Sequence, residues 1–470
     1  MKIPFNKLFI LLGLTGNLIF GQQKIQPYVD ERVELMSILF RLIDAQEYSS
    51  RNNELYVQDI EKHFAPVKSD AFLNQMKEVR NKNGVGYDAV MSMAVHLDIK
   101  NGKVTQIKQS KNTLEKRWPT KDVPALVNGI NTFYKKSNFH QFFKNHEADY
   151  KQAAKAYSDS IMSRFNQDWY VKFYGKQPNE EYKIVIGYGN GGGNYGPRVS
   201  PEGNKDIVYA IVSGGKFNGR TVSFSSGYAP VLIHEFNHSF VNYILETKDY
   251  KKQLAEAGVK IQNAVRKPME EQAYSSWETI INESIVRAAV IVYMKENNFS
   301  AKEIQEEYTE QGQRYFIWMP ELVQLLENYQ KNRKKYPSIE AFYPNIVTFF
   351  KRLGENIDAT IKEYGVHRPH IKSMTPDING KTDVDPNLKQ LIVRFDKTLL
   401  GKGFSINYGD LGKEGMPINK RPEYQDGNNA LKLEMELKPN TEYEFILTGN
   451  RFISTDGYPL EDYKVKFKTK

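Results

Sequence analysis

Apolar residues recur every three or four positions over much of the first two thirds of the chain, a spacing that predicts amphipathic helices. In a first region, residues 22–165, the pattern is clear at residues 29–43 and again at residues 126–134. The expectation for this region is a mainly helical N-terminal part that packs around whatever follows it.

The second region, residues 166–365, begins differently, with two runs rich in Val, Ile and Tyr at residues 182–187 and 206–213. Such runs predict strands. Helical spacing then returns in four segments, at residues 231–245, 301–311, 321–333 and 339–353. The order predicts a small sheet followed by helices.

The third region, residues 370–470, has a different pattern of apolar and polar residues. Short runs of alternating apolar and polar residues are separated by turn residues, at 390–395, 431–437 and 443–447. This pattern is typical of an all-β antiparallel sandwich. The predicted fold class is therefore α+β, with a helical region that contains a small sheet and a sandwich after it.

One predicted helix contains a cluster of polar residues that can perform chemistry. His234 and His238 are four positions apart, so both imidazoles project from one face, and Glu235 follows the first histidine. Two such histidines can bind one Zn²⁺, with Glu235 as general base toward a water that the metal activates. The alternative is a pair of hydrogen-bonded core histidines beside an ion-paired glutamate. The apolar surroundings disfavour it, because burying these groups without a metal is costly.

A catalytic zinc site normally has three protein ligands, so a third must come from elsewhere. The next histidine is His367, too distant for a local extension of the motif. Glu283 lies in an otherwise apolar helical run, where a carboxylate needs a cation, and it is the preferred candidate. Glu278 is the main competitor. Glu270 and Glu271 are weaker ones, because Pro, Lys and Gln around them indicate a loop.

His234-Glu235-x-x-His238 followed by Asn282-Glu283 resembles the gluzincin metallopeptidases, the thermolysin-like enzymes with two His ligands and one Glu. The resemblance implies a zincin-like catalytic region in which His234, His238 and Glu283 bind Zn²⁺ and Glu235 is the catalytic base and then proton donor. One position departs from it. Many gluzincins have an Asp four residues after the ligand Glu, whereas this chain has Arg287.

Gluzincins often stabilise the oxyanion with a Tyr or His from the helices after the third ligand. By that resemblance the candidates are Tyr293, Tyr308 and Tyr315. With 29 tyrosines in the chain, most of them are expected to be packing residues.

Composition and charge exclude several partners. The formal charge of +9 is modest for 470 residues, and the densest basic run, residues 331–335, is typical of the solvated end of a helix, so no nucleic-acid partner is expected.

Residues 187–197 contain Gly-x-Gly-x-x-Gly, but no helix is predicted directly after it, so no nucleotide is expected. Two readings stay open for this stretch: a loop that approaches substrate, or a plain surface loop. The chain has no cysteine, which leaves histidines and carboxylates as zinc ligands.

The first 21 residues combine a basic start with a short apolar core, as in a secretory signal peptide. Cleavage is expected near Gly21, and Thr15, Gly16 and Asn17 interrupt the apolar run, which disfavours a permanent membrane anchor. The mature protein is therefore expected to be secreted, periplasmic or on the cell surface.

Two further resemblances cover most of the chain. The Glu31-Arg-Val-Glu-Leu start, together with the His-Glu motif, looks like an uncharacterised family of secreted bacterial proteins known only as a domain of unknown function, over residues 28–350. Pro376, Asp456-Gly457 and similar turns in the third region look like the bacterial Ig-like domain of surface-layer type. That resemblance implies a spacer or adhesion module with contact to a cell surface or polysaccharide.

Together these observations predict a secreted zinc metallohydrolase, most simply a peptidase that cleaves amide bonds in a peptide or protein substrate. The alternative is a noncatalytic glycan-binding or surface-scaffold protein with a structural or vestigial zinc site. Glu235 argues against a purely structural site, because a structural zinc has no use for a general base.

Overall fold

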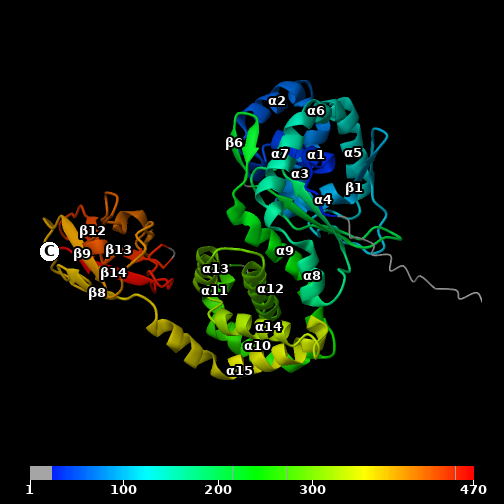
Figure 1. The fold of residues 1–470 in the computed structure, drawn as a ribbon. Helices are drawn as coiled ribbons and strands as arrows, with labels where there is room; N and C mark the ends of the chain where they lie inside the picture. The colour runs from blue at the N-terminus through cyan, green and yellow to red at the C-terminus, as the bar shows by residue number, and fades with distance from the viewer. Residues whose placement is uncertain (1–23, 214, 273, 450) are drawn as a thin grey trace, which may run out of the picture.

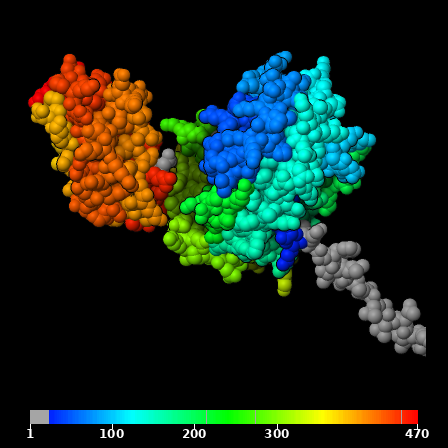
Figure 2. Space-filling view, turned by 90° about the horizontal axis from the view of Figure 1, so that it is seen from above, coloured from blue at the N-terminus to red at the C-terminus, as the bar shows by residue number. Residues whose placement is uncertain are grey.

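The computed structural model describes residues 24–213, 215–272, 274–449 and 451–470. The predicted signal peptide, residues 1–21, lies outside this part of the chain. The fold class is α+β, as predicted: many helices, several small sheets, and a β-rich C-terminal region set to one side of the helical part (Figures 1 and 2).

The N-terminal region is mainly helical, with a short hairpin after the fourth helix. Its elements are α1 (Glu31–Leu42), α2 (Glu54–Phe64), α3 (Ala71–Asn83), α4 (Asp88–His96), β1 (Leu97–Lys100), β2 (Lys103–Gln106), α5 (Val123–Lys136), α6 (Phe139–Asn145) and α7 (Glu147–Ser160). The second region then opens with α8 (Gln167–Tyr174), a helix that was not predicted. The predicted segments 29–43 and 126–134 correspond to α1 and α5. Asp30 is the N-cap of α1: its carboxylate accepts the Arg32 amide proton at 2.9 Å.

The two predicted strands of the second region pair in one small sheet. This sheet has the order β3-β5-β4, formed by β3 (Glu181–Ile186), β4 (Arg198–Val199) and β5 (Ile207–Val212). Strands β3 and β5 are parallel, and the short β4 runs antiparallel to β5 at the edge. A separate hairpin of β6 (Lys216–Asn218) and β7 (Thr221–Ser223) follows and was not predicted, because each of its strands has only three residues.

Seven helices complete the second region. They are α9 (Ala229–Val241), α10 (Tyr250–Ala264), α11 (Arg266–Glu270), α12 (Trp277–Glu296), α13 (Ala301–Gln313), α14 (Met319–Lys331) and α15 (Ile339–Val366). Helix α9 packs beside α12, and α10 lies along α15 (Figure 1). The predicted helix at 231–245 is shorter than expected: after Val241 the chain tightens into a 3-10 turn at Ile244–Glu246, which keeps Ile244 and Leu245 buried.

The C-terminal region consists of two antiparallel sheets. One has the order β11-β12-β9-β8 and the other the order β10-β13-β14. The strands are β8 (Ile371–Thr375), β9 (Gln390–Phe395), β10 (Ile406–Tyr408), β11 (Glu423–Gln425), β12 (Ala430–Glu434), β13 (Glu442–Leu447) and β14 (Tyr463–Lys468). Residues of both sheets, such as Leu391 and Phe445, share one hydrophobic cluster that is separate from the large cluster of the helical part.

None of the helices in the described residues is both long and apolar enough to cross a membrane.

Candidate metal site

Helix α9 presents His234 and His238 on one face. Pro230 lies in its first turn, where the missing amide proton costs nothing, and Leu232, Ile233, Phe236 and Phe240 are buried on its other faces. Both histidines are only partly exposed. The helix is therefore held by its apolar faces while the two imidazoles stay available.

Asn237, inside the motif, fixes the spacing between α9 and its neighbours. Its side chain is fully buried; it donates to the Val286 carbonyl of α12 at 3.2 Å and accepts a proton from the Tyr174 hydroxyl of α8 at 2.8 Å. These hydrogen bonds tie the motif helix to two other helices. From the sequence this residue was only an unspecified position between the two histidines.

Helix α12 supplies the third group. It starts at Ser276, whose hydroxyl accepts the Thr279 amide proton at 3.2 Å, and it is buried along nearly its whole length. Glu283 lies two turns in and is 7% exposed. Because α12 is apolar around it, this carboxylate is an exception that needs compensating charge.

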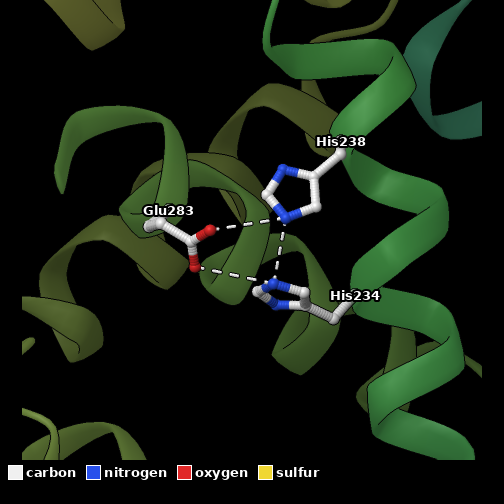
Figure 3. Close-up of side chains that lie close together, drawn as sticks. All are labelled: His234, His238 and Glu283. Carbon is white, nitrogen blue, oxygen red and sulfur yellow. Dashed lines mark hydrogen bonds and ion pairs between the residues drawn. The ribbon is translucent and has the colours of Figure 1, made fainter. Parts of the chain in front are cut away.

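The structure brings His234, His238 and Glu283 together (Figure 3). The two Nε2 atoms are 3.0 Å apart, and the Glu283 oxygens lie 3.5 Å from His234 Nε2 and 3.4 Å from His238 Nε2. One potential ligand atom from each residue lies within 4.8 Å of the others, so the group could bind a metal ion.

The electrostatics of the histidines suit a metal. Burial lowers the pKa of His234 well below its ordinary value, and His238 and Arg287 lower it further. His234 is therefore neutral, which is the form that coordinates metal. His238 has a second partner, since its Nδ1 lies 3.1 Å from the Asn242 Oδ1, a contact of the kind that orients a ligand histidine.

The three competing carboxylates lie elsewhere. Glu278 forms an ion pair with Lys251 at 3.3 Å, and Glu270 pairs with Arg266 at 3.6 Å at the exposed end of α11. Glu271 is exposed just after that helix. Of the four candidates weighed from the sequence, the structure places only Glu283 beside both histidines.

Arg287, one turn further along α12, forms an ion pair with the Glu283 carboxylate. Its Nε and Nη2 both lie 3.0 Å from the Glu283 Oε2, and its Nη1 donates to Gln311 Oε1 at 3.0 Å. Arg287 is itself buried. At the position where the gluzincin pattern has an Asp that holds a histidine, this chain therefore has an Arg that holds the glutamate.

Tyr274 completes this group. Its hydroxyl donates to Glu283 Oε2 at 3.2 Å and accepts a proton from Arg287 Nη2 at 2.8 Å. The three tyrosines suggested by the sequence are engaged elsewhere: Tyr293 is buried and donates to the Arg164 carbonyl, Tyr308 lies beside Lys295, and the Tyr315 hydroxyl accepts from Arg368. Tyr274 was missed because it lies before the third ligand, in a turn with no helical pattern.

Glu235 lies on the exposed side of α9, between two recesses. The apolar recess, about 80 Å³, is lined chiefly by Tyr157, Ile161, Ala210, Ile211, Val231 and Leu232. The polar recess, about 210 Å³, includes Arg198, His238 and Asn242. The protein atoms around the Glu235 carboxylate displace water and raise its pKa, an effect that His238 opposes and Glu283 increases.

The segment before β4 forms the edge of the sheet next to Glu235. Tyr195 exchanges two 2.9 Å backbone hydrogen bonds with Ile211, and the Pro197 carbonyl accepts the Tyr209 amide proton, which turns the backbone groups of Gly196 away from β5. A Cβ added to Gly196 would lie 3.8 Å from Glu235 Oε2. This edge is therefore directly beside the candidate base.

The glycine-rich stretch before this edge is packed against the N-terminal helices. A Cβ on Gly189 would meet the Glu34 carboxylate at 2.7 Å, and one on Gly191 would meet the Glu47 carbonyl at 2.0 Å. Glycine is required there by close approach to α1 and the turn after it. No helix follows, so the stretch lacks the context of a dinucleotide fingerprint, as predicted.

A family model described as "Domain of unknown function (DUF4932)" matches residues 25–349. The chain belongs to this family. The match covers the whole metal site, from α9 to α12, and agrees with the resemblance seen over residues 28–350. No curated protein matches the chain.

Solved structures give only weak similarities. CopC from Methylosinus trichosporium OB3b is 19% identical, with 22% of this chain and 94% of that chain covered and a TM-score of 0.18. The S-layer protein rSbsC(31-844) is 14% identical, with 49% of this chain and 33% of that chain covered and a TM-score of 0.17. Scores this low establish no common fold.

Proposed function

We propose that this protein is a secreted zinc-dependent hydrolase that cleaves amide bonds in peptides. The observation that supports it most directly is the convergence of His234, His238 and Glu283 from two packed helices, with Glu235 beside them at an open recess. In this proposal the first three residues bind the metal and Glu235 is the catalytic residue.

The donor set favours zinc. Two imidazole nitrogens and one carboxylate suit Zn²⁺, whereas Mg²⁺ and Ca²⁺ prefer sites made of oxygen atoms. A zinc ion there would act as a Lewis acid and lower the pKa of a bound water. Three protein ligands leave room for water and substrate, as in catalytic rather than structural zinc sites.

Glu235 and Tyr274 supply the chemistry of the protein itself. The Glu235 carboxylate takes a proton from the attacking water and passes it to the leaving amine, the ordinary exchange of a general base and acid. The Tyr274 hydroxyl accepts from Arg287 at 2.8 Å and donates to Glu283 Oε2 at 3.2 Å; by turning its one proton away from Glu283 it would donate to the oxygen that gains negative charge.

A peptide substrate is supported by the sheet edge. An extended peptide can pair with the free backbone groups of Gly196, which would place it alongside Glu235. The C-terminal sheets are assigned in the same proposal to an Ig-like spacer or adhesion module that contacts a cell surface or polysaccharide, and export follows from the signal-peptide pattern.

The test measures zinc in the purified mature protein and hydrolysis of a denatured protein pool by mass spectrometry. The variants are His234→Ala, Glu235→Gln and Glu283→Gln, with Glu278→Gln as matched control on the same helix. The expected result is about one zinc per chain, lost in the His234 and Glu283 variants. Glu235→Gln should keep zinc and lose cleavage, and Glu278→Gln should keep both.

Two outcomes would contradict the proposal. Normal zinc content in Glu283→Gln would remove Glu283 from the ligand set. Zinc bound without hydrolysis of any peptide would favour the noncatalytic alternative, a binding or scaffold protein with a structural or vestigial site, which a pull-down with soluble glycans would then examine.

A further inference from the structure

A second cavity lies on the other side of the glycine-rich stretch, between α1, α2 and the β6–β7 hairpin. Its volume is about 140 Å³, and none of the metal-site residues lines it. Its polar lining includes Arg41 and Asn53, and its apolar lining includes Val57, Ile186, Phe217 and Phe224. We call it the Arg41 cavity.

Arg41 places a cation there that has no ion-pair partner among the described residues, while Glu61 and Glu34 act on it from beyond ion-pair distance. The guanidinium is half-buried, its Nη2 donates to the Ser50 carbonyl, and its Nε is buried without a hydrogen-bond partner. The neighbouring Arg51 pairs with Glu54 and Glu61, whereas Arg41 forms no ion pair within the described residues. A buried donor on an unpaired cation is costly unless a ligand or water satisfies it.

Asn53 is the second unsatisfied group. It is 6% exposed, and among the described residues neither Oδ1 nor Nδ2 has a partner with hydrogen-bond geometry. The residue occupies the N-cap position of α2, yet its side chain does not cap the helix. The nearby Tyr188 hydroxyl donates its proton to the Arg220 carbonyl at 3.2 Å, so toward Asn53 it can only accept, from Nδ2. Burial raises the pKa of Tyr188 and this contact with Asn53 lowers it, which leaves the second Nδ2 hydrogen and Oδ1 for a ligand.

The unsatisfied atoms define what would fit. Arg41 Nε and Asn53 Nδ2 are hydrogen-bond donors, so a ligand that satisfies them must carry an acceptor, best an anionic one. Asn53 Oδ1 is an acceptor, so the same ligand must also carry a donor. The apolar residues of the lining call for an aliphatic group. A volume of 140 Å³ holds roughly five waters at about 30 Å³ each, the size of one small amino-acid residue.

We propose that the Arg41 cavity binds an α-carboxylate with an adjacent N–H group and a small aliphatic side chain. This chemistry belongs both to a free amino acid and to the C-terminal residue of a peptide. Arg41 Nε and Asn53 Nδ2 donate to the carboxylate, and Asn53 Oδ1 accepts from the N–H. The inference does not rest on the proposed hydrolysis, because the cavity is separate from the metal group.

The probes are N-acetyl-L-valine, L-valine and N-acetyl-L-valinamide, which keeps the shape but lacks the carboxylate. Binding to the full mature chain is measured by titration calorimetry, and again in His234→Ala, so that a carboxylate held by a metal is not counted. N-acetyl-L-valine is expected to bind with a Kd on the order of 1 mM, as usual for so small a ligand, and the amide at least about tenfold more weakly. If L-valine has the lower Kd, a free amino acid is the favoured ligand; if N-acetyl-L-valine has the lower Kd, the C-terminal residue of a peptide is.

The variant Asn53→Asp tests whether the ligand binds in the Arg41 cavity. Asp is as good an N-cap as Asn, so α2 should form normally, but a second carboxylate repels the ligand and should weaken binding by at least about tenfold. Asn74→Asp, exposed on α3, is the control with the same charge change and should bind like wild type. Arg41→Lys keeps the charge but lacks Nε, and serves if the first variant fails to fold.

Three results would overturn the inference: no saturable binding of either acid, equal binding of the acid and the amide, or unchanged binding in Asn53→Asp and Arg41→Lys. The first would mean that neither acid enters the cavity, the second that the carboxylate is not recognised, and the third that the ligand binds elsewhere on the protein. Absence of hydrolysis by the wild-type protein, or normal zinc content in Glu283→Gln, would contradict the proposed function and leave this inference unaffected, so the two proposals fail separately.

Discussion

Arg287 is the residue at which this chain departs most clearly from the gluzincin pattern. Its guanidinium holds the Glu283 carboxylate through two 3.0 Å contacts, and both side chains are buried. His238, in turn, is oriented by Asn242 rather than by an aspartate. The carboxylate is therefore compensated in the absence of metal, and the group is arranged before any metal binds.

Replacing Arg287 by Met should reveal that compensation. An unpaired buried carboxylate costs roughly 3 kcal/mol or more of unfolding free energy, and zinc should restore part of it by taking over as the compensating cation. Urea unfolding with and without zinc measures both effects. Arg314→Met is the matched control, because Arg314 and Glu310 form the same i,i+4 pair in a half-exposed position, worth less than about 1 kcal/mol. Equal losses in the two variants would contradict this reading.

Glu34 gives a second prediction, on pH. It is fully buried on α1, where it accepts from the Tyr56 hydroxyl at 2.7 Å and the Gly189 amide at 3.1 Å, and burial raises its pKa to about 7. The folded state keeps this proton after the unfolded chain has lost it. Stability should therefore be fully present below about pH 4.5 and fall by about 3 kcal/mol as pH rises to about 7.

Glu34→Gln should remove that pH dependence and be more stable than wild type at pH 8. Unfolding free energies at pH 5 and pH 8 test it, with Glu78→Gln, exposed on α3, as control. If wild type and Glu34→Gln gain the same stability between pH 5 and pH 8, the prediction is wrong, because ionising Glu34 would then cost little unfolding free energy.

At the scale of elements, α9 and β5 together form the apolar recess beside Glu235. Among the described residues that line it, Glu235 alone is charged, and Tyr228 and Val231 are exposed at its rim. If the protein hydrolyses peptides, the residue next to the cleaved bond should be aliphatic. Cleavage-site profiling should show at least about tenfold preference for Leu over Asp, since an apolar pocket leaves a carboxylate unpaired.

Ala210→Leu fills this recess from β5 and should shift the preference toward Gly and Ala. Val259→Leu, exposed on α10 outside the recess, should leave it unchanged. An unaltered cleavage profile in Ala210→Leu would assign the selectivity to another surface.

The same scale shows which elements the sequence could predict. Long periodic segments were found close to their expected bounds: residues 301–311 correspond to α13, residues 182–187 to β3, and residues 390–395 to β9. The predicted 339–353 helix continues past Gly354 to Val366, where Ile357, Ile361 and Tyr364 keep the apolar spacing and pack against the core. Short elements such as β6 and α11 were missed, since three to five residues do not establish a period.

At the scale of the whole molecule, the helical part and the C-terminal sheets have separate hydrophobic clusters. Arg368 joins them: its guanidinium donates to the Pro459 and Leu460 carbonyls of the C-terminal region and to the Tyr315 hydroxyl of the helical part. Beside it, Tyr458 of the C-terminal region stacks on His367 and contacts Tyr364. Because each part has a hydrophobic cluster of its own, each should keep its fold without the other.

A chain that ends at residue 369 should therefore still unfold cooperatively and bind zinc with unchanged stoichiometry. Calorimetry of the whole protein, of this shortened chain and of residues 370–470 alone would test it, and the whole protein should show two transitions that match those of the parts. Failure of the shortened chain to fold would mean that the sheets contribute to the stability of the helical part.

The sequence by itself determined the helices that hold the site, the change to a β-rich region near residue 370, and the pair His234 and His238, because periodicity and i,i+4 spacing are local properties of a chain. It also ranked Glu283 first, since a carboxylate in an apolar helix needs a partner. Only the tertiary structure decided that Glu283 reaches both histidines while Glu278 does not, and that Arg287 and Tyr274 support it. The contacts of Glu283 with the two histidines join segments more than forty residues apart, and their geometry depends on how α9 and α12 pack, which no local pattern encodes; the contacts of Arg287 and Tyr274 are closer in sequence, but their partners too depend on how these side chains pack.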